Sequence, residues 1–462
     1  MPVRRDALFP ELPAEWRVSL LPLIQRYVHG GAKVVVLDDD PTGTQTVHDV
    51  VVLTEWPVDA LVEELRQPDS VVYILTNSRA YAAERAREIN LEIAAALRAA
   101  SEITGREVAI VSRSDSTLRG HYRTETEALI EGLDAPVDGL LVVPFFLEGG
   151  RYTIDDVHYV DEGGWLVPAA DTEFARDPVF GYQESDLRAW VSARSGGVWS
   201  PEEVASISLC DLRDGGPRQV EILLSRLSNA QPCVVNAVSY RDLEVLVAGI
   251  LASELQGHRY LYRTAASFVR VRAGLEPAPL LSASDFRQQP GGLVVAGSFV
   301  GRTTAQIEEA TRLPNVVPIE LDAAALLGAG ASEVVAHARD TAASAMAGGY
   351  DALVYTSREH IGVAGSLDAG QRISAGLVAL VAGLPTRPAW VIAKGGITSS
   401  DIATGALNIR RALVRGQAIP GVPVWRTGAE SLWPDLDYVV FPGNVGGPGA
   451  LAEMIVMLRG TA

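Results

Sequence analysis

Short runs of apolar residues alternate along the chain with longer stretches of helical periodicity. In the first half these runs span residues 34–37, 71–75, 108–111 and 140–143. In the second half they span residues 293–296, 352–355, 390–393 and 438–441. Strands that are apolar throughout, rather than alternating, are typical of a parallel sheet covered by helices on both faces. The pattern therefore predicts an α/β fold built twice, as two α/β domains with mainly parallel sheets and an active site in the interdomain cleft.

Proline and glycine cluster between the two sets of strands, over residues 275–291, and indicate the connection between domains. We place the domains at residues 1–280 and 281–462. Residues 82–100 have a helical pattern, and residues 11–29 form an amphipathic pattern that predicts a helix covering the first sheet. Weaker periodicity over residues 151–231 predicts an insertion or flap on the first domain.

The composition of the chain argues against several classes of partner and site. The 462 residues carry a formal net charge of −18, which argues against a nucleic-acid partner because no basic field attracts phosphate backbones. The first residues lack a secretory h-region and no apolar run reaches the ~18 residues of a membrane span, so we expect a cytoplasmic protein without a membrane partner. Two cysteines make neither a disulfide framework nor a zinc site. The sequence leaves the oligomeric state open, a homo-oligomer included.

Polar residues follow the first three strands directly. Carboxylates and a turn follow the first strand (Asp38, Asp39, Asp40, Pro41, Thr42, Gly43), Asn77 and Arg79 follow the second, and Asp115, Ser116, Thr117 and Arg119 follow the third. Ligands of open α/β sheets bind beyond the carboxyl ends of the strands. Three consecutive carboxylates suit a polyol or a bound cation, although a capped Asp-Pro-Thr-Gly turn explains them equally well.

Arginine forks bind carboxylates with two parallel hydrogen bonds, so carboxylates, arginines and hydroxyls together favour a small hydroxy acid as ligand. Other polar residues in this half have simpler explanations. His121 and His158 have no partner in sequence that suggests acid/base chemistry, and we expect structural or surface roles for them. Glu125 and Glu127 fit a solvated helix face.

Glycine-rich loops follow the strands of the second half. They contain Ser298, Ser357, the run Lys394, Gly395, Gly396, Ile397 and Thr398, and the run Gly443, Asn444, Val445 and Gly446. Glycines let a loop backbone approach phosphates, and one of only two lysines in the chain adjoins a Gly-Gly pair, so the loops predict a nucleotide site. The chain contains no Walker motif, no nucleophile elbow, and no dinucleotide fingerprint at the first strand.

The ordered set of motifs resembles the four-carbon acid sugar kinase family. The motifs are Asp39-Asp40-Pro-Thr42-Gly43, Asp115-Ser116-Thr117-Leu-Arg119-Gly120, Gly395-Gly396-Ile-Thr398 and Gly443-Asn444-Val-Gly446. The resemblance implies ATP-dependent phosphorylation, with Mg²⁺, of the C4 hydroxyl of a threonate, an erythronate or a 3-oxo-tetronate. It also implies that the first domain binds the sugar acid and the second binds ATP.

The resemblance and the strand-end pattern together suggest roles for these residues. Asp39 or Asp40 would activate the hydroxyl, and the substrate would contact Thr42, Gly43, Asn77, Arg79, Asp115, Ser116, Thr117 and Arg119. The nucleotide would contact Ser298, Ser357, Lys394, Gly395, Gly396, Thr398, Gly443, Asn444 and Gly446. Ile397 and Pro442 depart from the family pattern. Two alternatives stay open, an NAD-linked hydroxy-acid dehydrogenase and a non-catalytic sugar-acid-binding protein.

Overall fold

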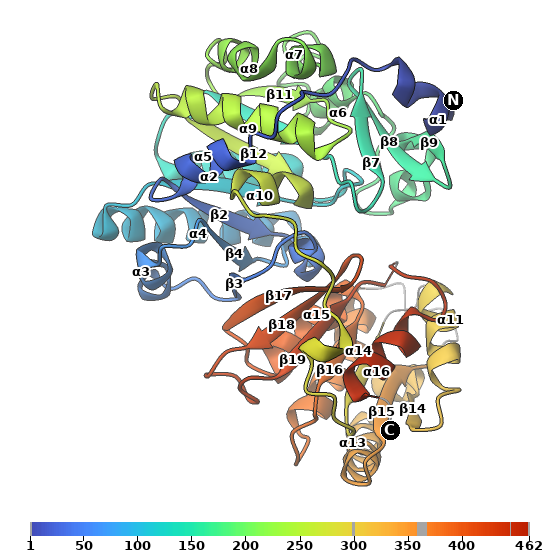
Figure 1. Ribbon diagram of the computed structural model, residues 1–462. Coiled ribbons are helices and arrows are strands. Elements are labelled where there is room, and N and C mark those ends of the chain that lie inside the picture. Colours follow the sequence, from blue (N-terminus) through green and yellow to red (C-terminus); the bar gives the residue numbers. More distant parts are fainter. Residues whose placement is uncertain (1, 298–300, 358–366, 444, 461–462) are drawn as a thin grey trace. The chain divides into compact units, whose positions relative to one another are not determined.

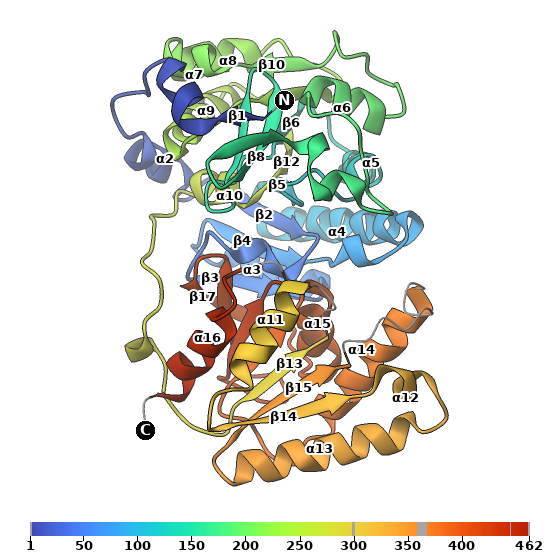
Figure 2. The same cartoon turned by 90° about the vertical axis from the view of Figure 1, so that its right-hand side faces the viewer.

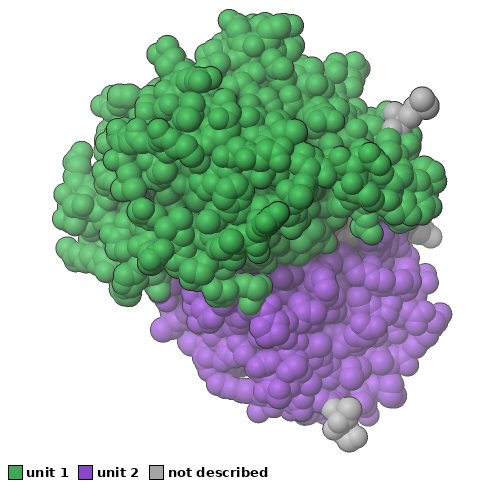
Figure 3. All heavy atoms as spheres, turned by 45° about the horizontal axis from the view of Figure 1, so that its top comes forward, with its two compact units in different colours: residues 1–39, 55–277 green, residues 40–54, 278–462 purple. Residues whose placement is uncertain are grey.

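The computed structural model describes residues 2–297, 301–357, 367–443 and 445–460. By its internal contacts the chain divides into two compact units, coloured separately in Figure 3. Unit 1 comprises Met1–Asp39 and Glu55–Pro277, and unit 2 comprises Asp40–Thr54 and Ala278–Ala462. Residues 40–54 therefore lie early in the chain but belong to unit 2.

Unit 1 contains a parallel sheet with the strand order β10-β11-β6-β12-β5-β2-β4, whose strands are labelled in Figure 1 and Figure 2 together. Its strands are β2 (Lys33–Asp38), β4 (Val71–Leu75), β5 (Val108–Arg113), β6 (Gly139–Val143), β10 (Ala205–Ile207), β11 (Gln231–Val235) and β12 (Tyr260–Thr264). The central strands are buried along almost their whole length, as their uninterrupted apolar runs predict. The four strands expected in this half are confirmed.

Helices surround this sheet. They are α1 (Arg5–Leu8), α2 (Leu21–Val28), α3 (Val58–Arg66), α4 (Ala83–Thr104), α5 (Tyr122–Leu133), α6 (Leu187–Arg194), α7 (Leu209–Arg213), α8 (Gly216–Leu224), α9 (Tyr240–Glu254) and α10 (Ala266–Arg272). The predicted helix over residues 11–29 is wrong in extent, because α2 starts only at Leu21, with Pro22 in its first turn. It packs mainly against α9 and α10.

A second, antiparallel sheet interrupts unit 1, with the order β1-β9-β8-β7. Its strands are β1 (Val3–Arg4), β7 (Arg151–Ile154), β8 (Val157–Glu162) and β9 (Trp165–Pro168). The predicted insertion over residues 151–231 is thus confirmed for its first part. It is wrong for the remainder, because β10 and β11 are strands of the main sheet.

Unit 2 contains a second α/β sheet with the strand order β3-β17-β18-β19-β16-β13-β15-β14, whose strands are labelled in Figure 1 and Figure 2 together. The strands are β3 (Val50–Leu53), β13 (Leu293–Ala296), β14 (Val316–Leu321), β15 (Asp351–Thr356), β16 (Val391–Lys394), β17 (Arg411–Ile419), β18 (Val422–Thr427) and β19 (Asp437–Phe441). The five strands from β19 to β14 are parallel, and those from β3 to β19 pair antiparallel. The α/β fold with mainly parallel sheets is therefore confirmed in both units.

The helices of unit 2 are α11 (Gly301–Ala310), α12 (Ala323–Leu327), α13 (Ala331–Ala347), α14 (Leu367–Ala382), α15 (Gly396–Asp401) and α16 (Ala450–Arg459). Apolar residues of α11 and α16 share one core cluster with β13, β16 and β19, so these helices cover one face of the sheet. Nowhere in the described part of the chain is a helix both long and apolar enough to cross a bilayer.

Candidate functional site

The carboxyl ends of neighbouring strands bring the predicted residues of unit 1 together. Asp38 at the end of β2 is in register with Arg113 at the end of β5, which in turn is in register with Thr264 of β12. Because these strands are parallel, the residues that follow them emerge at one edge of the sheet. The site in unit 1 is built on this edge.

Asp39 is the most enclosed carboxylate at this edge, with 1% of its surface exposed. Its Oδ2 accepts a hydrogen bond of 2.6 Å from the hydroxyl of Ser114, and its Oδ1 lies 3.2 Å from Nη2 of Arg79. Burial raises the pKa of Asp39, although the neighbouring Arg79 acts in the opposite direction. A carboxylate of raised pKa is suited to accept a proton from a hydroxyl.

Asp115 is a second carboxylate of this edge, but it is held in its charged form. Arg119 Nε donates to its Oδ2 at 2.7 Å, and Arg79 Nη1 lies 3.5 Å from its Oδ1. Burial alone would raise the pKa of Asp115, but Arg119 and Arg79 hold it well below its usual range. The hydroxyl of Thr117 also donates to this carboxylate. Asp115 therefore fixes the arginines that the sequence predicts as substrate ligands.

Glu125 contradicts the prediction of a solvated helix face. The residue is only 2% exposed, and its carboxylate accepts hydrogen bonds from the hydroxyl of Ser78 and from Arg263. Arg263 also donates to Ser114 Oγ at 2.7 Å, which links Glu125 to Asp39 through two side chains. Glu127, in contrast, forms the expected exposed pair with Arg123.

The remaining predicted residues of unit 1 shape the backbone of the edge. Asn77 has a left-handed conformation, with φ of 50°, and its N–H donates to Asp38 O at 3.4 Å. The carbonyl of Ser116 accepts from Nε2 of His158 at 2.8 Å. His158 is fully buried, which lowers its pKa to about 4. His158 is thus an internal donor to the loop carbonyl, whereas Nε2 of His121 bonds the carbonyl of Tyr81.

The residues that directly follow Asp39 belong to unit 2. Asp40 caps a short 3₁₀ helix (Pro41–Thr44) by accepting from the backbone N–H of Thr42 at 2.9 Å, and Gly43 N–H donates to Asp40 O. A Cβ built on Gly396 would lie 2.6 Å from Asp40 Oδ2, so only glycine allows this approach. Asp40 thus lies against the Gly-Gly loop.

The loop after β16 is anchored by Lys394. The side chain of Lys394 is fully buried, its Nζ donates to Pro442 O at 3.0 Å, and it lies 4.1 Å from the ring centroid of Phe441. Gly395 has φ of +110°, which favours glycine. Thr398 in the first turn of α15 approaches Gly297, where an added Cβ would lie 2.7 Å from its Oγ1.

The other predicted nucleotide ligands occupy neighbouring strand ends. The Ser357 hydroxyl accepts from the N–H of Ala323 at 3.0 Å, Gly443 O accepts from the hydroxyl of Thr303 at 3.3 Å, and Gly446 has φ of +80°. Ser298 and Asn444 lie outside the described residues.

Gln306 of α11 holds the last of these loops and is absent from the predicted set. Its Nε2 donates to the carbonyls of Val445 and Gly447, both at 2.9 Å, while its buried Oε1 has no partner among the described residues. The signal in the sequence was a glutamine on the buried face of a helix.

The donor set fits a nucleotide with a divalent cation. Glycine-rich turns leave the backbone accessible, and the buried hydroxyl of Thr356, at the end of β15, has no described partner. The described residues contain no cluster of three side chains able to hold a metal ion. Mg²⁺ commonly takes one or two carboxylates together with phosphate oxygens, and Asp40 beside Gly396 supplies such a carboxylate.

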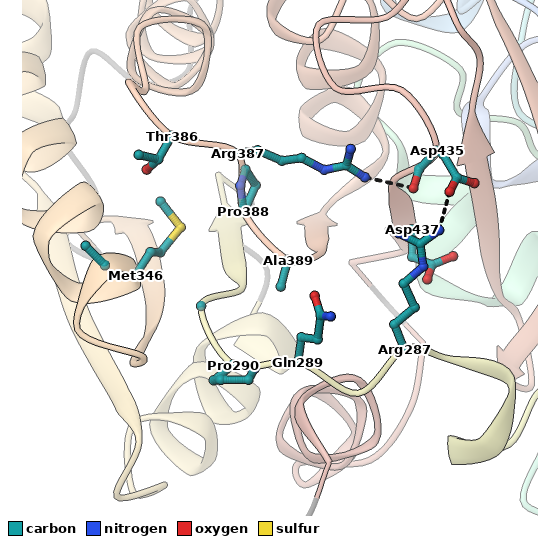
Figure 4. Close-up of a pocket in the computed structure, with 12 residues that line it drawn as sticks. Arg287, Gln289, Pro290, Met346, Thr386, Arg387, Pro388, Ala389, Asp435 and Asp437 are labelled. Atoms are coloured by element: carbon teal, nitrogen blue, oxygen red, sulfur yellow. Dashed lines mark hydrogen bonds and ion pairs between the residues drawn. The ribbon is translucent and has the colours of Figure 1, made fainter.

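A cavity of about 320 Å³ lies elsewhere in unit 2 (Figure 4). It adjoins the amino ends of β13, β16 and β19, whereas the predicted loops follow their carboxyl ends. Arg287 and Arg387 both bond Asp435 beside it. None of the predicted site residues lines this cavity.

Known protein families match the chain in both units. A family model described as a sugar-binding N-terminal domain matches residues 34–272, and one described as a nucleotide-binding C-terminal domain matches residues 293–451. No curated protein matches the chain.

Solved structures are similar to the chain over most of its length. A DUF1537 protein from Haemophilus influenzae has 18% identity and a TM-score of 0.64, covering 92% of this chain and 100% of its own. A Salmonella typhimurium protein described as a tRNA synthase has 18% identity and a TM-score of 0.67, covering 91% and 98%. A citrate-bound, domain-swapped dimer of a DUF1537 protein from Bordetella bronchiseptica has 21% identity and a TM-score of 0.40, covering 92% and 98%. With both domain models in order along the chain, the protein belongs to the four-carbon acid sugar kinase family, DUF1537.

Proposed function

We propose that the protein is an ATP-dependent kinase that phosphorylates the C4 hydroxyl of a four-carbon sugar acid. Membership of the family supports the reaction class, because one domain model is described as sugar-binding and the other as nucleotide-binding. The substrate would be a threonate, an erythronate or a 3-oxo-tetronate.

One observation carries the proposal. Asp39 is buried at the carboxyl edge of the sheet in unit 1, and the next residue, Asp40, lies against the Gly396 loop of unit 2. The chain itself therefore joins the carboxylate suited to a hydroxyl with the loop suited to phosphates. This assigns different roles to two acids that the sequence alone does not distinguish.

In the proposed reaction Asp39 orients the C4 hydroxyl and accepts its proton. The C4 oxygen forms a bond to the γ-phosphorus of ATP while the bond from that phosphorus to the β,γ-bridging oxygen breaks, and ADP leaves. Such transfer depends on positioning and on neutralising charge, so a single base contributes roughly 10²–10⁴-fold. The raised pKa of Asp39 suits this role.

The nucleotide would occupy the loops of unit 2. The backbone amides around Gly395 and Gly446 would face the phosphates, and Lys394 would hold the neighbouring loop through Pro442. Mg²⁺ bound near Asp40 would supply neutralisation of the phosphate charge.

The test is ADP release from MgATP with a panel of threonate and erythronate stereoisomers and their 3-oxo relatives. We expect turnover with at least one acid. No turnover with any acid, while ATP still binds, would reject the substrate assignment. A thermal shift with NAD but none with ATP would favour the dehydrogenase alternative, and binding of an acid without turnover would favour a non-catalytic binding protein.

A further inference from the structure

Arg151 is a partly buried cation for which the sequence predicts no role. It begins β7 and follows a turn after β6 that is closed by backbone hydrogen bonds between Phe146 and Arg151, of 2.8 and 3.1 Å. Its Nη1 donates to the carbonyl of Gly149, while its Nε is buried and has no partner among the described residues. Arg151 therefore joins the carboxyl edge from the antiparallel sheet.

Arg151 differs from the other arginines of the edge in its charge balance. Each of the others has a carboxylate within 4 Å, namely Arg79 with Asp39, Arg113 with Asp38, Arg119 with Asp115 and Arg263 with Glu125. No described carboxylate forms an ion pair with Arg151 within 4 Å. Burial lowers the pKa of Arg151, and the charge of the more distant Asp115 only partly opposes this effect. A partly buried guanidinium without an ion pair is incompletely neutralised, so an anion bound there would be stabilised.

The guanidinium groups of Arg119 and Arg151 both pack against the ring of Phe174. The guanidinium carbons of Arg119 and Arg151 lie 5.2 and 5.4 Å from its ring centroid. Phe174 belongs to a 3₁₀ helix, Glu173–Arg176. Contact with an aromatic ring fixes a guanidinium and leaves its N–H groups directed along the plane.

Arg79 is less suited to bind a ligand carboxylate, because its two terminal nitrogens already contact Asp39 and Asp115. We propose that Arg151, held beside Arg119 by Phe174, binds the carboxylate of the substrate and makes the protein select acids over neutral polyols. This inference rests on the proposed function for the substrate class. It adds a specificity-determining residue, and it assigns the carboxylate to a different arginine from the two that the sequence suggests.

Calorimetric titration without nucleotide tests the inference. The ligands are threonate and erythronate and, as neutral analogues of the same length, threitol and erythritol. We expect the unaltered protein to bind an acid more tightly than either tetritol. Arg151→Gln should weaken binding of the acid roughly 10- to 100-fold, because a charge-assisted pair of hydrogen bonds is lost, and should leave tetritol binding unchanged. Arg151→Lys keeps the charge without the fork and should give a smaller loss.

Arg123→Gln is the matched control, because it removes the same charge from an exposed ion pair of unit 1. Its affinity for the acid should equal that of the unaltered protein. Thermal melts show which variants fold. If Arg151→Gln does not fold, the affinity of Arg151→Lys for the acid tests the inference instead.

Three outcomes would overturn the inference: unchanged acid affinity in both Arg151 variants, equal affinity of the unaltered protein for acids and tetritols, or no binding of any acid. Acid binding that depends on Arg151, without any ADP release, would leave the inference standing and reject the kinase.

Discussion

The hydroxyl of Ser114 lies 2.6 Å from the carboxylate of Asp39 and donates a hydrogen bond to it. The same hydroxyl oxygen accepts from Arg263, so the orientation of Asp39 is set by a chain of buried side chains. A general base needs such a fixed position within hydrogen-bonding reach of its proton donor.

Asp39→Asn should therefore lower kcat by roughly 10²–10⁴-fold and change the affinity for ATP little, because the amide keeps the shape but cannot accept the proton. Steady-state kinetics with MgATP, together with equilibrium nucleotide binding, measure the two effects. Asp59→Asn, on the exposed surface of α3, is the control and should leave both values unchanged. Equal losses of kcat and of ATP affinity would indicate a structural role for Asp39.

The positive charge of Arg79 lowers the pKa of Asp39 and so opposes the effect of burial. Removing this charge should therefore change how activity depends on pH. In Arg79→Gln the pKa of Asp39 should rise further, and the base would be protonated at a higher pH than in the unaltered protein. The acid limb of the kcat/KM profile should then move to higher pH. Arg79→Lys keeps a positive charge and should keep the limb near its original position. Profiles from pH 5 to 9 that coincide for all three proteins would contradict the assignment of Asp39 as base.

Glu125 and Glu127 provide a matched pair for stability. Glu125→Gln leaves the buried guanidinium of Arg263 without its carboxylate, and loss of one partner of a buried pair costs about 3–5 kcal/mol. Glu127→Gln breaks only an exposed pair with Arg123, which contributes at most about 1 kcal/mol. Urea unfolding of both variants measures the difference. Similar losses of stability would show that the Glu125–Arg263 pair is not the stabilising element.

His158 predicts how stability depends on pH. Its pKa is about 4 in the folded protein, because of burial, against 6.5 in an unfolded chain. Between these values the unfolded chain binds more protons, so the free energy of unfolding falls as the pH decreases from 6.5 to 4, by about 3 kcal/mol in total.

The carbonyl of Ser116 can only accept, so Nε2 carries the proton and Nδ1 accepts from the hydroxyl of Thr153. His158→Gln keeps a donor for Ser116 but does not titrate. The decline in stability between pH 6.5 and 4 should therefore be about 3 kcal/mol smaller in this variant, measured by urea unfolding at both pH values. An unchanged decline would assign the acid sensitivity to other groups.

Much of the fold and of the strand-end pattern was accessible from the sequence, because a buried parallel strand is a continuous apolar run and its carboxyl end is where polar residues begin. Long-range partners were not accessible in this way. Arg151 joins the edge from an antiparallel sheet, and Asp40 leaves the unit of its neighbour Asp39; neither relationship has a local signal.

The prediction that Glu125 lies on a solvated helix face fails for a different reason. Residues 125 and 127 are two positions apart, which places them on opposite sides of a helix, whereas Glu125 shares its face with the buried residues Tyr122 and Leu129. Helical periodicity, applied residue by residue, would have assigned Glu125 to the interior.

A single carbon added at Gly396, in unit 2, should impair the use of MgATP. In Gly396→Ala the new Cβ would lie 2.6 Å from Oδ2 of Asp40 and 3.3 Å from its Cγ, so the carboxylate must move away from the loop. Displacing a group that orients a metal typically lowers activity or metal affinity roughly 10- to 100-fold. We expect a loss of that size in kcat/KM for MgATP, with binding of the sugar acid in the absence of nucleotide unchanged.

The control for this variant is Gly370→Ala in α14, where an added Cβ meets no atom of the described residues within 4 Å. It should leave catalysis unchanged and raise stability by about 0.5–1 kcal/mol, because alanine favours a helix interior over glycine. Kinetics at varied MgATP and a melting curve on both variants complete the comparison. If Gly396→Ala used MgATP as well as Gly370→Ala, the position of Asp40 against the loop would have no part in catalysis, and the proposed division of roles between Asp39 and Asp40 would fail.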